Sequence, residues 1–136
     1  MRNIFKFLSI LLLMANKYWG VSFHYDLKGC NMNLITSKDR LKEWVKSLVS
    51  HISMECHGEP LIEHFGTPNS NLEGWTLIQL IKTSSITLHA NDHTGEAYLD
   101  LFTCKDLPNL QEKIEQHIFE WFNPIHITYE KLYRQA

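Results

Sequence analysis

The chain has few cysteines, little net charge and no low-complexity stretch, and each absence excludes a class of protein. Its 136 residues include three cysteines, none in the Cys-x-x-Cys spacing of redox and zinc motifs, and three cannot all pair within one chain. We therefore expect a reduced, cytoplasmic protein. The formal net charge is -2 and no basic stripe stands out, so we expect no nucleic-acid partner.

The chain also lacks an apolar run long enough to cross a bilayer comfortably, and we expect no membrane partner. Residues 7–15 are apolar and follow a basic start, as in a signal peptide, but a spanning helix needs about 20 residues. Three interpretations remain open: a leader, a first helix or strand, or a start codon assigned too early. We favour the last, with Met14 as the start. Residues 1–16 are then an N-terminal extension to one domain over residues 17–136.

Hydrophobic residues make up 44% of the chain and charged residues 21%, which is typical of a globular domain with one core. Apolar residues at helical spacing predict a helix that ends near residue 52, capped by Thr36 or Ser37, and a second helix between Pro108 and Pro124. Strand-like patterns occupy residues 17–27, 61–65, 75–81, 85–89, 97–103 and 125–132. The predicted fold class is α+β: a two-layer sandwich of a mainly antiparallel sheet with two helices on one face.

Two neighbouring strand-like segments carry residues suited to covalent chemistry. Ser84 follows Thr83 at the start of one segment, His89 lies five positions later, and Cys104 ends the next segment. A serine hydroxyl can attack the preceding carbonyl, and the resulting ester can eliminate and hydrolyse to an electrophilic pyruvoyl group. His89 can act as an acid or base and Cys104 as a proton donor. Each residue alone also fits a structural role, as a turn, a hydrogen-bonded strand histidine or a buried thiol.

The eight histidines give no metal motif. His89 and His93 are four apart, a spacing that aligns side chains on a helix, but their segment is predicted to be strand and turn. Cys56, His57 and His64 lie close in sequence, yet no second cluster completes a site. We therefore expect no metal.

Taken together, residues 84–89 (Ser-Ser-Ile-Thr-Leu-His) and 100–104 (Asp-Leu-Phe-Thr-Cys) resemble the prokaryotic S-adenosylmethionine decarboxylase family. That family has a Glu-Ser-His-Leu-Thr-Ile-His segment followed, without a gap in spacing, by one like Asp-Val-Phe-Thr-Cys. The resemblance covers roughly residues 17–136 and includes Asp26–Cys30, Gly58–Pro60 and His64–Gly66.

The resemblance implies a proenzyme that cleaves itself between Thr83 and Ser84. Residues up to 83 would form the β chain, and the α chain would begin at Ser84, which becomes the pyruvoyl cofactor. It further implies that His89 serves self-processing, that Cys104 donates a proton in turnover, and that Thr76 supplies a second active-site hydroxyl. The substrate would be S-adenosylmethionine, decarboxylated for spermidine synthesis by a homodimer of processed units, with residues from two protomers at each site.

The chain departs from the family pattern around its site. Thr83 replaces the glutamate before the cleavage serine, Ser85 replaces the following histidine, and the Trp-Pro-Glu after the catalytic histidine becomes residues 91–93 (Asn-Asp-His). For substrate binding, the expected residues are Phe65, as a stacking ring, with Asp92 or Glu96 in place of the family's glutamate. Two alternatives stay open: a pyruvoyl-dependent ornithine or arginine decarboxylase, and an unprocessed homologue without catalytic activity.

Overall fold

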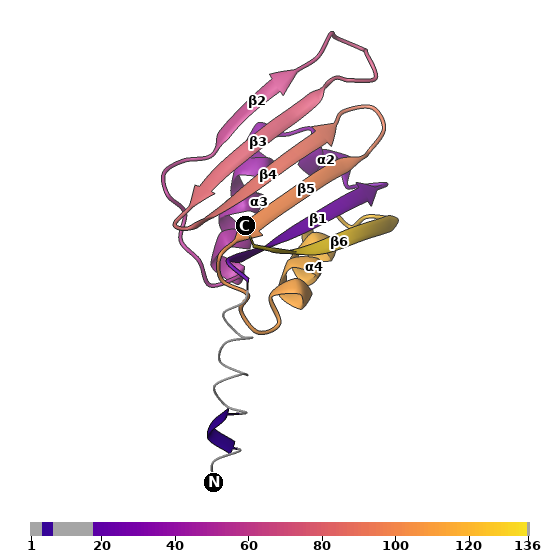
Figure 1. Cartoon of the computed structure of the whole chain (residues 1–136). Helices are drawn as coiled ribbons and strands as arrows, with labels where there is room; N and C mark the ends of the chain where they lie inside the picture. The colour runs from indigo at the N-terminus through magenta and orange to yellow at the C-terminus, as the bar shows by residue number, and fades with distance from the viewer. Residues whose placement is uncertain (1–3, 7–17, 136) are drawn as a thin grey trace.

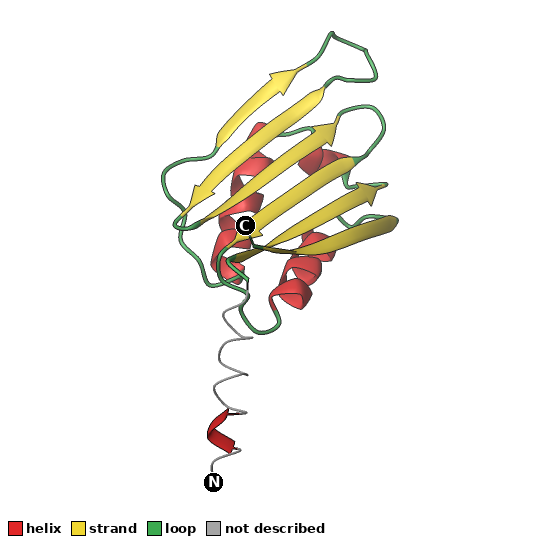
Figure 2. Ribbon diagram, viewed as in Figure 1, coloured by secondary structure: helices red, strands yellow, loops and turns green. Residues whose placement is uncertain are grey.

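Alternating burial along the strands divides one six-stranded sheet into a covered face and an open face (Figures 1 and 2). The computed structural model describes residues 4–6 and 18–135, so most of the predicted N-terminal extension, including the proposed start at Met14, lies outside the described residues. The elements are β1 (Gly20–Lys28), α2 (Met32–Ile35), α3 (Lys38–His51), β2 (Leu61–Phe65), β3 (Gly74–Ile81), β4 (Ser84–Asn91), β5 (Ala97–Thr103), α4 (Leu110–Trp121) and β6 (His126–Arg134).

The sheet order is β2-β3-β4-β5-β1-β6, and every neighbouring pair is antiparallel. The central pair β4 and β5 aligns Ser84 with Thr103 and His89 with Tyr98. This register matters for function because it fixes which of the predicted site residues share a face of the sheet.

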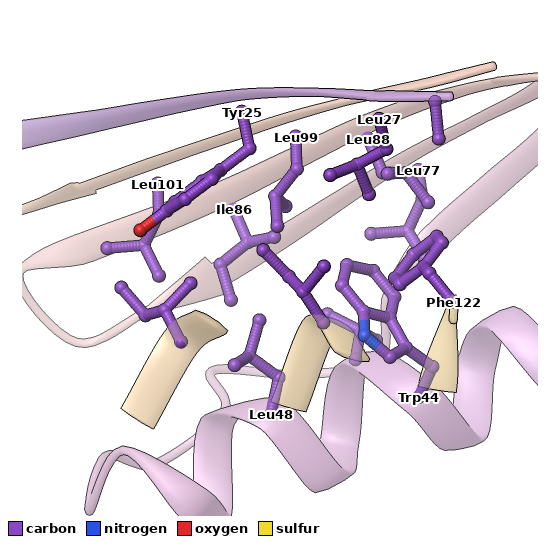
Figure 3. Close-up of a cluster of buried hydrophobic side chains, with 14 of the residues drawn as sticks. Tyr25, Leu27, Trp44, Leu48, Leu77, Ile86, Leu88, Leu99, Leu101 and Phe122 are labelled. Carbon is purple, nitrogen blue, oxygen red and sulfur yellow. The ribbon is translucent and has the colours of Figure 1, made fainter. Parts of the chain in front are cut away.

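The core lies between the covered face and helices α3 and α4 (Figure 3). Strand β1 contributes its odd-numbered residues from Val21 to Leu27, all at most 1% exposed. Trp44 of α3 is fully buried and meets Phe122 edge to face, with ring centroids 5.0 Å apart. Ser37 caps α3, since its side chain accepts a hydrogen bond from the Arg40 N–H.

Among the described residues, no helix covers the open face of the sheet (Figure 1). This face exposes a set of large apolar side chains. Each lies on the side of its strand that faces away from the helices, and each is 40–60% exposed: Leu61, Phe65, Ile78, Leu80, Tyr98 and Leu132. Apolar surface gathered on one face in this way is typical of an interaction surface.

The predicted α+β sandwich and its order of long elements are confirmed. The structure adds α2, a four-residue helix that is too short to show a helical period in the sequence. Among the described residues, no helix is long and apolar enough to cross a membrane.

Candidate active site

The candidate site begins at the tight turn between β3 and β4. Lys82 and Thr83 form this two-residue turn, and Thr83 has a φ of 68°. The left-handed region suits glycine, whereas a threonine pays a steric cost there because its β carbon is branched. The peptide between Thr83 and Ser84 therefore follows a strained residue, as is common at functional sites.

Ser84 begins β4 with its hydroxyl held by a neighbouring strand. Its Oγ donates to Thr103 Oγ1 at 2.8 Å, and the same Thr103 oxygen accepts the Lys105 N–H at 3.1 Å. Thr103 is fully buried. The serine predicted to be the nucleophile is thus fixed next to the strained residue rather than free in solvent.

Ser84 and Cys104, which the sequence places on neighbouring strand-like segments, line the same pocket. This pocket has a volume of 590 Å³ and lies among the β3–β4 turn, the end of β5 and the loop after α3. Cys104 is a half-buried free thiol. Lys82, Lys105 and Glu55 also line the pocket, so its lining has one more positive than negative side chain, which suits a carboxylate.

His89 and Thr76 lie elsewhere, on the open face. Their side chains are hydrogen-bonded, with 3.2 Å between His89 Nδ1 and Thr76 Oγ1. His89 lies five positions after Ser84 on the same strand, an odd step, so the two side chains point to opposite faces, about 17 Å apart along an extended strand. Within one chain, His89 is therefore out of reach of Ser84.

The predicted substrate-binding residues gather near His89 rather than near Ser84. Phe65 is 58% exposed and lines a 150 Å³ pocket that also contains Thr76 and His89. Glu96 accepts a hydrogen bond from the Tyr98 hydroxyl, and this contact raises the pKa of Tyr98. Asp92 instead bonds to His64, with 2.6 Å between Oδ2 and Nε2.

Sequence reasoning missed Thr103 as the partner of Ser84. Its position is visible in the sequence only through strand register, since Thr103 faces Ser84 when the two strands pair around the 91–96 connection. The two-residue period of a strand also predicts that Ser84 and His89 point to opposite faces.

The chain is similar in sequence and in structure to known proteins. The family model described as S-adenosylmethionine decarboxylase matches residues 22–135. Among solved structures, the chain is similar to an adenosylmethionine decarboxylase from Aquifex aeolicus VF5, with a TM-score of 0.71 and 21% sequence identity. That match covers 88% of this chain and 93% of the other. The comparison with curated proteins gave no match.

Proposed function

Because the chain belongs to the S-adenosylmethionine decarboxylase family, we propose that it cleaves itself between Thr83 and Ser84 and works through a pyruvoyl group made from Ser84. The family assignment makes it a carboxy-lyase that converts S-adenosylmethionine to its decarboxylated form, the aminopropyl donor for spermidine. The family is pyruvoyl-dependent, and this chain offers a serine at the matching place.

The observation that carries the proposal is the strained Thr83 directly before a positioned Ser84 hydroxyl. Attack by Ser84 Oγ on the Thr83 carbonyl would break the peptide bond and leave an ester and a free amine. Elimination then releases the Thr83 carboxylate, and water replaces the nitrogen, which leaves as ammonia. The left-handed backbone raises the energy of the intact peptide, so cleavage releases strain.

In turnover, a pyruvoyl carbonyl supplies an amine-binding, electron-accepting centre that permits loss of carbon dioxide. The chain's own residues do the rest. Cys104, in the same pocket as Ser84, would deliver the proton that replaces the carboxylate. Lys82 and Lys105 would attract the substrate's carboxylate into the pocket.

The separation of His89 from Ser84 supports a site shared between two copies of the chain. We assign the processing base to His89 of a second protomer, oriented by its Thr76, in a homodimer of processed units. The exposed apolar side chains of the open face provide the surface for that association. Phe65, in the His89 pocket, would stack on the adenine ring, with Glu96 nearby as a polar contact. Three free thiols agree with the cytoplasmic location that we propose.

Release of labelled carbon dioxide from carboxyl-labelled S-adenosylmethionine tests the activity. Wild-type protein should release it, Ser84→Ala should not, and ornithine or arginine should not serve as substrates. Release from either amino acid but not from S-adenosylmethionine would favour the alternative that the altered residues 91–93 motivate. No release from any of the three by wild-type protein would favour the unprocessed homologue.

A further inference from the structure

A second cluster of chemically active side chains lies at the far end of β4 from Ser84. His64 comes from β2, Glu73 from the residue before β3, and Asp92 from the residue after β4. One ligand atom from each lies within 4.8 Å of the other two. A fourth residue, His93, places its Nε2 3.1 Å from Glu73 Oε1.

The distances within this cluster suit a shared metal ion. Two ligands bound to zinc at about 2.0–2.2 Å in a tetrahedral arrangement are separated by roughly 3.3 Å. His64 and Asp92 are hydrogen-bonded at 2.6 Å and His93 and Glu73 at 3.1 Å, whereas the ligand atoms of His64, Glu73 and Asp92 lie within 4.8 Å of one another, so their side chains would shift to surround an ion. The carboxylates of Glu73 and Asp92 are each only 15% exposed.

One carboxylate oxygen in the cluster lacks a protein partner. Asp92 Oδ1 is buried and accepts no hydrogen bond from the residues that the structure describes, although its other oxygen bonds to His64. A buried carboxylate oxygen without a donor is costly, and a bound cation would compensate it. Two imidazoles with two carboxylates form a mixed N/O donor set that favours zinc and similar transition metals over magnesium or calcium.

The backbone around the cluster is held in place by further hydrogen bonds. Asn91 Oδ1 accepts the N–H groups of His93 and Thr94 at 2.9 and 3.0 Å. Glu73 accepts the Asn69 N–H through Oε2 at 3.1 Å, and its carbonyl accepts the Asp92 N–H at 3.0 Å. Such outer contacts orient metal ligands before the ion binds.

We propose that His64, Glu73 and Asp92 bind one divalent transition-metal ion of the zinc class, and that His93 turns from its contact with Glu73 to become the fourth donor. This site differs from the sequence-based expectation of no metal, because its ligands come from three segments that only the fold brings together. The ion would fix the loop 66–73 against the β4–β5 connection, beside the pocket that contains Phe65. The inference does not depend on the proposed decarboxylase activity.

Titration with cobalt(II) and zinc(II) tests the site directly. Wild-type protein should bind one equivalent of cobalt with the intense visible absorption of a tetrahedral complex, and zinc should displace it. Asp92→Asn and His64→Gln should weaken zinc binding by about tenfold or more, since each removes a ligand. Magnesium should not compete. The matched control is His24→Gln, because His24 and Asp100 form a similar pair at 2.7 Å with no third ligand, and it should bind zinc as wild type does.

The result that would overturn the proposal is wild-type protein that binds no zinc, or that binds it equally well after either ligand substitution. Circular dichroism of each metal-free variant separates lost ligation from lost folding. If His64→Gln fails to fold, Glu73→Gln provides the same comparison, because it removes a ligand from the loop rather than from a strand.

Discussion

At the scale of single residues, the account depends most on the left-handed backbone of Thr83. We predict that Thr83→Gly slows self-cleavage about tenfold, because glycine removes a strain of about 1–2 kcal/mol from the intact peptide. The measurement is the rate at which full-length chain disappears after synthesis, followed by gel or mass spectrometry. Asn123→Gly is the matched control, since Asn123 also has a positive φ (43°) but lies beyond α4, away from the turn. An unchanged or faster rate in Thr83→Gly would contradict the role assigned to strain.

Thr103 gives a second prediction at this scale. Thr103→Val leaves the Ser84 hydroxyl and the Lys105 N–H without their acceptor. We expect it to destabilise the fold by about 1–3 kcal/mol and to slow cleavage, whereas Thr103→Ser should retain both properties. Denaturant unfolding in a Ser84→Ala background measures stability without interference from cleavage. Equal cleavage rates in the valine and serine variants would argue against Thr103 as the residue that positions Ser84.

Single residues also show where sequence reasoning reached its limit. The residue types and spacing placed Ser84 and Cys104 on neighbouring strand-like segments, and the structure shows that both line one pocket. The five-residue spacing from Ser84 to His89 on one strand also implies that the two side chains point to opposite faces, but the sequence prediction did not draw that consequence. The left-handed φ of Thr83 could not be predicted, since β-branched residues seldom adopt it.

At the scale of elements, the contact between α3 and α4 contains a histidine that should make stability depend on pH. His117 is 2% exposed and bonds to Ser47, with 2.9 Å between Nε2 and Oγ. Burial, with a smaller contribution from nearby His51, lowers the pKa of His117 to about 4. The ordinary value is about 6.5, so in the acidic range the unfolded chain binds a proton that the folded chain does not.

We therefore predict that the free energy of unfolding falls as the pH decreases from 6.5 to 4, by up to about 3 kcal/mol from this residue. In His117→Gln, we expect a lower free energy of unfolding at pH 7 and the loss of the pH dependence that His117 contributes. Urea unfolding of both proteins in the Ser84→Ala background, at several pH values, gives the comparison. Parallel curves for the two proteins would show that His117 does not titrate as described.

Elements were predicted more completely than sites. The strand 61–65 agrees with β2. The helix predicted with Thr36 or Ser37 as its cap agrees with α3, whose cap is Ser37, because apolar residues at helical spacing mark its face. Helix α4 begins without the side-chain cap that α3 has. Asn109 precedes α4 with a left-handed φ of 61° and makes no side-chain capping hydrogen bond. Helix α2 escaped prediction because four residues contain barely one turn.

At the scale of the whole molecule, the proposed function requires two copies of the chain. We predict that Ser84→Ala and His89→Ala each fail to self-cleave alone, and that coexpression restores cleavage of the His89→Ala chain. The mixed dimer would contain one complete site, formed by Ser84 of one chain and His89 of the other. Tagged chains, isolated as mixed dimers and analysed by mass, provide the measurement. If coexpression restores no cleavage while mixed dimers form, the shared site is wrong.

The open face of the sheet is the reason to expect that two copies of the chain associate. Its apolar surface could be recognised only once the assembled sheet was known. The strand patterns predicted which residues share a face of each strand. They did not predict which strands are neighbours, so they did not show that exposed apolar residues from several strands gather on one face. The exposed side chains on this face, with Leu80 at 56%, then identify the surface on which a second copy would pack.

The measurement that tests the central claim most directly is the intact mass of the purified protein. If Ser84 forms the pyruvoyl group, the wild-type protein should give two chains, one ending at Thr83 and one of residues 84–136 with a pyruvoyl group at its start, and Ser84→Ala should give a single uncut chain. A wild-type protein that shows only the full-length chain would contradict it.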